Sequence, residues 1–267
     1  MLRTLDLFSG IGGFSLGLER TGGFRTVAFC ECEPFCQRVL RKHWPEIPIF
    51  DDVRTLNGRE VEVGDVDVIC GGFPCQDISV AGGQAGINGE KSGLWREFAR
   101  LIGELRPQYA IVENVAALLH RGIERVLGDL AALGYDAEWH CIPASYVGAP
   151  HQRDRVWIIA YPGAPGIQGR GVSVGRRGEC SSPTAETAPD HNTVRQLQPR
   201  WSEQDIRGWS LHSASQCWPV AWTEQLESLC RMDDGLPDGL DEECTLVYGN
   251  AVVPAIPEII GRAILAQ

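Results

Sequence analysis

The sequence has 267 residues, of which 43% are hydrophobic and 22% are charged, and its formal net charge is −11. These values are typical of a soluble globular protein with one large domain or two unequal domains, and they argue against a general polyanion binder. No run of about 18 apolar residues occurs and the chain begins with a strand pattern, so we expect neither a membrane span nor a signal peptide. The ten cysteines lack the layout of a disulfide scaffold, so we expect a cytoplasmic protein. Cys30, Cys32 and Cys36 match no common zinc spacing, so we expect no metal site.

The first predicted strand, Thr4–Phe8, leads into a glycine-rich turn that contains Gly10, Gly12 and Gly13. A predicted helix over residues 15–20 follows. Glycines let a backbone turn tightly and approach a nucleotide at a helix N-terminus, but a plain tight turn explains them equally well.

The second predicted strand, Thr26–Cys30, ends at Glu31, about 20 residues past the glycine turn. A carboxylate in this position can accept hydrogen bonds from ribose hydroxyls, whereas the alternative is a solvated loop glutamate. A helix over Pro34–His43 and a strand over Ile47–Phe50 follow, and the strand ends at Asp51-Asp52. Together with the glycine turn, this order favours the ribose role.

A cysteine follows the next predicted strand, Val66–Cys70. Gly71 and Gly72 are predicted to end that strand, and the ring of Pro74 restricts the turn. Cys75 therefore lies at the carboxyl end of a strand, where open α/β sheets place their ligands. This position favours a nucleophile, and the alternative is a small buried hydrophobe.

The glycine-rich segment 81–93 follows, and we interpret it as a candidate lid rather than a disordered surface connection. The further predicted elements are a helix over Leu94–Leu105, a strand over Tyr109–Val112, a helix over Ile123–Leu133 stopped by Gly134, and strands over Glu138–Pro143 and Val156–Tyr161. Glu113 follows a strand, where a cap or turn role is the alternative to a functional one. Arg153 and Arg155 are predicted to alternate on one face as the last strand begins, and alone they would indicate a surface ion pair.

Strands alternate with helices through about residue 161, which predicts a doubly wound α/β domain with a mostly parallel sheet. The stretch 162–209 is rich in Gly, Ser, Pro, Arg and Gln, and it indicates a small irregular domain or a partly disordered arm. The chain then ends with an apolar helix over Ala255–Ala266.

These motifs together resemble those of the cytosine-5 DNA methyltransferase family. In the family's order, the matching segments are Asp6–Phe14 (cofactor motif), Gly72–Gln76 (nucleophile motif), Glu113–Val115 (acid motif), Gln152–Arg155 (paired arginines) and Gly249–Pro254 (closing motif).

The resemblance implies an S-adenosylmethionine-dependent methyltransferase fold, with residues 1–161 as the catalytic domain and 162–244 as a small irregular target-recognition region. Residues 245–267 would return to the catalytic domain, with the last helix beside the first. It also implies transfer of a methyl group to C5 of cytosine in double-stranded DNA through a cysteine adduct and base flipping, as in restriction-modification systems. We expect the protein to be a monomer. Two alternatives are the tRNA-methylating branch of the family and a non-catalytic nucleic-acid-binding relic.

Roles for individual residues follow from the same resemblance. The catalytic residues would be Cys75 as nucleophile, Glu113 as proton donor to ring N3, and Arg153 and Arg155 as orienting cations. The cofactor-binding residues would be Asp6, Phe8, Gly10, Gly12, Glu31, Asp52, Val53, Pro74, Leu94 and Asn250. The substrate-binding residues would be Gln76, Ser79, Arg176 and Arg177.

Overall fold

The computed structural model describes residues 1–58, 66–74, 94–149, 153–163 and 251–266, and these residues fall into two compact units. The first unit comprises the described parts of Met1–Asp52, Pro143–Arg153 and Trp201–Gln267, and the second comprises those of Val53–Ile142 and Asp154–Arg200. Within the described ranges, no helix is long and apolar enough to cross a membrane.

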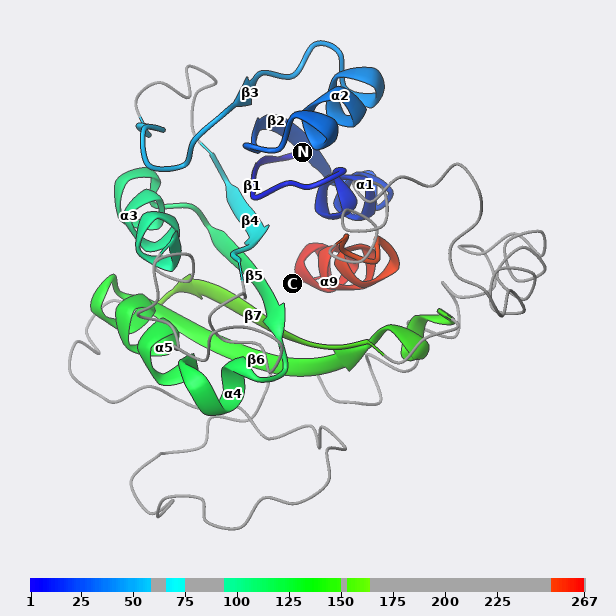
Figure 1. The fold of residues 1–267 in the computed structure, drawn as a ribbon. Coiled ribbons are helices and arrows are strands. Elements are labelled where there is room, and N and C mark those ends of the chain that lie inside the picture. The colour runs from blue at the N-terminus through cyan, green and yellow to red at the C-terminus, as the bar shows by residue number, and fades with distance from the viewer. Residues whose placement is uncertain (59–65, 75–93, 150–152, 164–250, 267) are drawn as a thin grey trace, which may run out of the picture. The chain divides into compact units, whose positions relative to one another are not determined.

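The first unit contains parallel strands in the order β3-β2-β1 (Figure 1). Its elements are β1 (Leu2–Leu7), α1 (Gly13–Glu19), β2 (Phe24–Cys30), α2 (Pro34–His43), β3 (Ile49–Phe50), the 3-10 helix η3 (Ala144–Val147) and α9 (Ala255–Leu265). Residues 4–7 of β1 and 26–30 of β2 are buried on both faces, which is typical of parallel strands. The predicted alternation of strands and helices is confirmed here.

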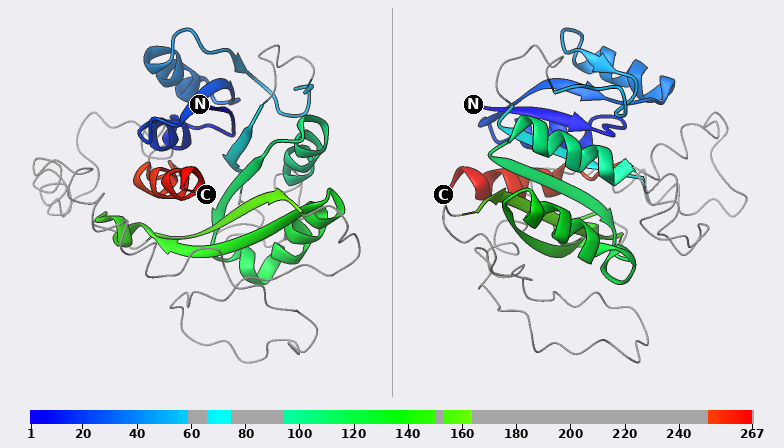
Figure 2. Two further views of the ribbon diagram at one scale, coloured as in Figure 1. Left: turned by 180° about the vertical axis from the view of Figure 1, so that it is seen from behind. Right: turned by 90° about the vertical axis from the view of Figure 1, so that its left-hand side faces the viewer.

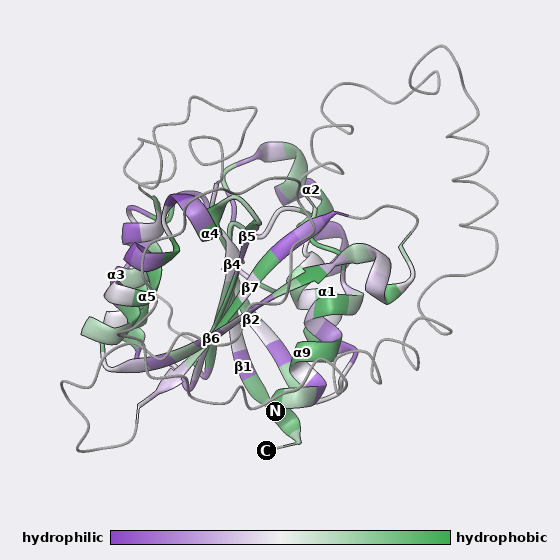
Figure 3. Ribbon diagram, turned by 90° about the horizontal axis from the view of Figure 1, so that it is seen from below, coloured by the Kyte–Doolittle hydropathy of each residue, from purple (hydrophilic) through white to green (hydrophobic). Residues whose placement is uncertain are grey.

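The last helix, α9, packs beside the first helix, α1 (Figures 1 and 2). Glycines allow the close approach: a Cβ added to Gly17 of α1 would meet the carbonyl oxygen of Pro254, and one added to Gly261 of α9 would lie 3.1 Å from Leu18 Cδ2. Helix α9 is mostly hydrophobic (green in Figure 3) and most of its residues are buried. The predicted packing of the last helix beside the first is therefore confirmed.

The second unit has the strand order β4-β5-β7-β6, with β4 parallel to β5 and β5 antiparallel to β7. Its elements are β4 (Val68–Gly72), α3 (Trp95–Leu105), β5 (Tyr109–Val115), α4 (Leu118–Arg121), α5 (Ile123–Ala132), β6 (Tyr135–Pro143) and β7 (Asp154–Pro162). Helices α3 and α5 contact each other and lie on the same side of these strands (Figure 2). The apolar stripe of α3, which contains Trp95, Phe98 and Ile102, is buried.

Three strands of the second unit, β5, β6 and β7, are longer than the sequence predicts, and β4 begins and ends two residues later than predicted. Gly71 and Gly72 lie inside β4 rather than after it, because β4 stays paired with β5 as far as the Gly72–Glu113 pair. Strand β5 runs past Val112 to Val115, because it pairs with β7 over these residues. Pairing with neighbouring strands thus outweighs the weak strand propensity of glycine, and Glu113 lies within a strand.

Candidate cofactor and catalytic sites

The glycine-rich turn of the first unit has the tight backbone that its glycines favour. Phe8, Gly10 and Gly12 have φ values of 53°, 54° and 86°, and Gly12 is the N-cap of α1. A Cβ added to Gly12 would lie 2.6 Å from the ring of Trp44, whereas one added to Gly10 would meet no described atom within 4 Å. Among the described residues, Trp44 therefore fills the space beside Gly12, whereas the space beside Gly10 holds no other atom.

Glu31, at the end of β2, holds this turn. Its Oε2 accepts a hydrogen bond from the Gly10 amide at 2.7 Å, and its Oε1 accepts one from the Glu33 amide at 2.8 Å. The residue is only 9% exposed. A carboxylate has about four acceptor positions, so both oxygens keep capacity for further donors. The structure thus brings together the predicted glycine turn and the predicted ribose acceptor.

Carboxylates gather at the ends of β2 and β3. Gln37 Nε2 donates to the Glu31 carbonyl oxygen at 2.7 Å and to Asp51 Oδ1 at 2.8 Å, and so joins the two strand ends. Burial, followed by the negative charges of Glu31 and Asp52, raises the pKa of the Cys30 thiol to about 12. This thiol stays protonated at neutral pH, and the negative surroundings favour a positively charged ligand.

Asp6 fastens the start of α1. Its carboxylate is fully buried, and Oδ2 accepts hydrogen bonds from Ser15 Oγ at 2.7 Å and from the Ser15 amide at 3.3 Å. The Ser9 hydroxyl donates to the Asp6 carbonyl oxygen at 2.6 Å. These contacts hold the two sides of the glycine turn. A direct contact between Asp6 and a cofactor stays a prediction.

We expect Glu31→Ala to weaken S-adenosylmethionine binding by on the order of 1.5–3 kcal/mol, because a charged acceptor for two hydroxyls is lost. Isothermal titration calorimetry measures this change, and DNA affinity should stay the same. Glu33→Gln is the matched control, since this exposed neighbour also loses a carboxylate. Unchanged cofactor affinity in Glu31→Ala would remove Glu31 from the site.

The second unit contains an ion pair between two of the predicted catalytic residues. Arg155 Nε lies 2.9 Å from Glu113 Oε1, and the two side chains are only 21% and 12% exposed. Strand register explains the pair. Glu113 on β5 lies opposite Trp157 on β7, and Arg155 is two residues from Trp157, so Glu113 and Arg155 are diagonal neighbours on one face of the sheet. Arg155 therefore fixes one oxygen of the Glu113 carboxylate.

The other oxygen of Glu113 occupies space that only glycine leaves free at position 72. A Cβ added to Gly72 would lie 2.6 Å from Glu113 Oε2. Gly72 pairs with Glu113 across β4 and β5, and it does not have a left-handed backbone. A side chain at this position would therefore displace the carboxylate rather than strain the strand.

We expect Gly72→Ala to fold normally but to lower kcat roughly 10- to 100-fold, because small displacements of catalytic groups are costly. Steady-state methylation kinetics and thermal unfolding measure the two effects. Gly128→Ala on α5 is the matched control, since a Cβ there meets no described atom within 4 Å. A wild-type kcat for Gly72→Ala would show that the position of Glu113 is not critical.

The backbone and ring of Phe73 are held by Asn114 and Trp95, neither of which has an individual role in the predicted site. Asn114 Nδ2 donates to the Phe73 carbonyl oxygen at 3.0 Å, and the Phe73 ring packs against Trp95 with centroids 5.5 Å apart. Asn114 is 2% exposed. A polar residue next to Glu113 in an apolar strand was the available signal. These contacts fix the position of Phe73, which directly precedes Pro74.

Arg153 and Arg155 have different partners. Arg153 has φ of 41° and precedes β7, so the predicted strand alternation does not hold there. Its Nη2 donates to the Ala251 carbonyl oxygen at 2.9 Å. Arg153 thus contacts the predicted closing motif, whereas Arg155 contacts Glu113.

The other predicted residues are placed as follows. Of the cofactor set, Phe8, Gly10, Gly12, Glu31 and Asp52 lie in the first unit, and Val53, Pro74 and Leu94 lie in the second. Val53 is buried, and Leu94 is the N-cap of α3. The residues that lie outside the described parts of the chain are Cys75, Gln76, Ser79, the segment 81–93, Arg176, Arg177 and Asn250.

Comparison with known proteins gives consistent matches. Residues 2–198 match the family model for C-5 cytosine-specific DNA methylase. The Type II methyltransferase M2.BsuMI of Bacillus subtilis is 36% identical over 167 residues, which cover 60% of this chain and 42% of that protein. The Type II methyltransferase M.CviJI of Paramecium bursaria Chlorella virus IL3A is 35% identical over 159 residues, which cover 59% of this chain and 42% of that protein. The chain thus spans less than half of the length of these relatives.

The fold has a counterpart among solved structures. A mutant of DNMT2 from Spodoptera frugiperda superposes with a TM-score of 0.62 at 15% identity, and the match covers 100% of both chains. With the strand pairing described above, this likeness confirms the predicted fold class.

Proposed function

This chain belongs to the C-5 cytosine-specific DNA methylase family, and from that membership we propose that it methylates C5 of cytosine in double-stranded DNA. Cys75 is the proposed nucleophile. The observation that carries the proposal is the Glu113–Arg155 ion pair, which lies against Gly72 of the nucleophile motif.

S-adenosylmethionine is the proposed methyl donor, and it supplies an electrophilic methyl group when it is bound. The chemistry of the first unit fits this ligand. Glu31 keeps acceptor capacity for ribose hydroxyls, and the carboxylates around it complement a positively charged sulfonium and ammonium. In this proposal Glu31 and Gly10 hold the nucleoside, while Asp52 and Val53 flank the adenine.

Glu113 of the second unit and Cys75 of the nucleophile motif are the residue types that the proposed chemistry on the base requires. A thiolate at Cys75 would form a bond to C6 of cytosine and move an electron pair to C5, which makes C5 nucleophilic. A protonated Glu113 would donate to N3 and stabilise the charge that develops on the ring. After C5 is methylated, a base such as water would remove the C5 proton, the C5–C6 double bond would re-form, and the bond between sulfur and C6 would break to release the Cys75 thiolate.

In duplex DNA the faces of the cytosine ring are covered by the neighbouring bases, so Cys75 could not reach C6 there. The target cytosine must therefore leave the stack, and we propose base flipping as part of the reaction. The proposed domain division also follows from the motifs: residues 1–161 and 245–267 supply the chemistry, and residues 162–244 supply target recognition.

Bisulfite sequencing of plasmid from cells that express the protein tests the proposal. We expect cytosine methylation at a defined sequence with the wild type and none with Cys75→Ser. A parallel assay with labelled S-adenosylmethionine compares duplex DNA and tRNA as substrates. Methylation of tRNA alone would favour the tRNA-methylating branch, and cofactor binding without methylation of either would favour the non-catalytic alternative.

The proposed recognition region makes a separate prediction. Replacing both Arg176 and Arg177 with glutamine should weaken DNA binding and lower its salt dependence, because phosphate contacts release counterions. Cofactor affinity should not change. Binding measured over a salt series decides the matter, with Arg125→Gln on α5 as the control. An unchanged slope and affinity would place recognition elsewhere.

A further inference from the structure

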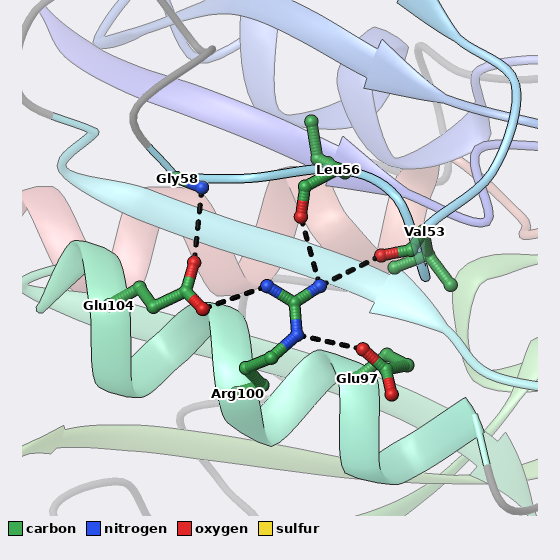
Figure 4. Close-up of polar contacts among 6 residues, drawn as sticks. All are labelled: Val53, Leu56, Gly58, Glu97, Arg100 and Glu104. Carbon is green, nitrogen blue, oxygen red and sulfur yellow. Dashed lines mark hydrogen bonds and ion pairs between the residues drawn. The ribbon is translucent and has the colours of Figure 1, made fainter.

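Arg100 of α3 has an acceptor on each side of its guanidinium group (Figure 4). Nε lies 2.7 Å from Glu97 Oε2, and Nη1 lies 2.8 Å from Glu104 Oε1. Nη2 donates to two backbone carbonyl oxygens, those of Val53 and Leu56, both at 2.9 Å. The two glutamates thus orient the guanidinium, and the guanidinium holds a loop.

The same helix also holds the far end of this loop. Glu104 Oε2 accepts a hydrogen bond from the Gly58 amide at 3.1 Å. Side chains of α3 therefore bind three backbone groups within residues 53–58 (Figure 4). Val53 and Leu56 are also buried, at 4% and 2% exposure. Residues 53–58 are in no strand, and these side chains of α3 help to fix the course of the loop.

The loop follows Asp51 and Asp52 directly in the chain. The segment that precedes it contains Asp51, whose carboxylate shares the Gln37 Nε2 donor with the Glu31 carbonyl oxygen. Asp52 is close enough to the strand end to raise the pKa of Cys30. One segment of chain therefore runs from the surroundings of Glu31 to the carbonyl that Arg100 binds.

We infer that Arg100 is a positioning residue for nucleoside binding: by holding the Val53 carbonyl, it sets the conformation of the Asp52–Val53 segment that contacts the adenine. The inference rests on the proposed binding of S-adenosylmethionine. Arginine is required because its planar fork presents several donors in fixed directions at once, which the ammonium group of lysine cannot reproduce.

Binding of S-adenosylmethionine and of adenosine to the full-length protein tests this inference by calorimetry. We expect Arg100→Gln to raise both dissociation constants on the order of tenfold, since the misplaced segment contacts the part that the ligands share. In kinetics with saturating DNA, KM for S-adenosylmethionine should rise while kcat changes little. Arg100→Lys should restore the charge but not the affinity.

Two further variants keep the test decisive. Glu104→Ala releases the Gly58 end and removes one of the two carboxylates that orient Arg100, but Glu97 and the Val53 carbonyl remain as partners, so we expect a smaller loss of affinity. This milder variant also serves if Arg100→Gln does not fold. Arg125→Gln removes the same charge from an ion pair with Asp129 on α5, and its affinities should equal those of the wild type.

The outcomes separate the two proposals. A lower melting temperature for Arg100→Gln with unchanged dissociation constants would show that Arg100 only stabilises the fold, and would overturn the inference. Equal affinities of Arg100→Lys and wild type would overturn the requirement for the guanidinium fork. Wild-type protein that binds no S-adenosylmethionine would instead overturn the proposed function, and the inference with it.

Discussion

Cys75→Ser is expected to abolish methyl transfer while leaving S-adenosylmethionine affinity close to that of the wild type. The nucleophile in this chemistry is a thiolate, and a serine hydroxyl is far less ionised and far less nucleophilic near neutral pH. The cofactor is proposed to bind mainly through other residues, so its affinity is a measure of intact folding. Methylation assays and calorimetry on the same preparation provide both values.

A covalent trap tests the same residue directly. Duplex DNA that carries 5-fluorocytosine has fluorine in place of the proton that must leave C5, so the sulfur–carbon bond should persist. We expect a denaturation-resistant adduct with the wild type and none with Cys75→Ser. Methylation by the variant at the wild-type rate, or no adduct with the wild type, would exclude Cys75 as the nucleophile.

The sequence predicts helix ends correctly where local residues, such as proline and glycine, determine them. Helix α2 begins at Pro34 and ends at His43, as predicted, because proline favours the first turn of a helix and the apolar pattern is regular. Gly134 follows α5 with φ of 83°, as expected of a glycine that ends a helix. The helices α4 and η3 were not predicted, because four residues are too few to show a period.

Those parts of the candidate site that depend on sequence spacing could be predicted, and those that depend on strand register could not. The spacing between the glycine turn and Glu31 is a sequence property, and the Gly10–Glu31 hydrogen bond agrees with it. The pairing of Glu113 with Arg155 depends on the register of β5 against β7, which no local pattern encodes. The space that Gly72 leaves for Glu113 likewise depends on the extended pairing of β4 with β5.

Glu113→Gln is expected to lower kcat roughly 10²- to 10⁴-fold, the range typical of a lost general acid. Glutamine keeps the shape of glutamate, and its carbonyl oxygen can still accept from Arg155 Nε, so the pairing of β5 with β7 should persist. Its amide can donate a hydrogen bond to N3 but cannot transfer a proton. The variant therefore separates proton donation from simple hydrogen bonding.

Single-turnover methylation at saturating cofactor and DNA measures the chemical step for this variant. Glu258→Gln on α9 is the matched control, because Glu258 is another poorly exposed carboxylate, with Oε1 2.7 Å from Arg262 Nη2. The control should change thermal stability more than the rate. If Glu113→Gln retained the wild-type rate while Cys75→Ser was inactive, the ring nitrogen would need only a hydrogen-bond donor at position 113. A loss in Glu113→Gln with normal cofactor and DNA affinity would instead place Glu113 at the proton-transfer step.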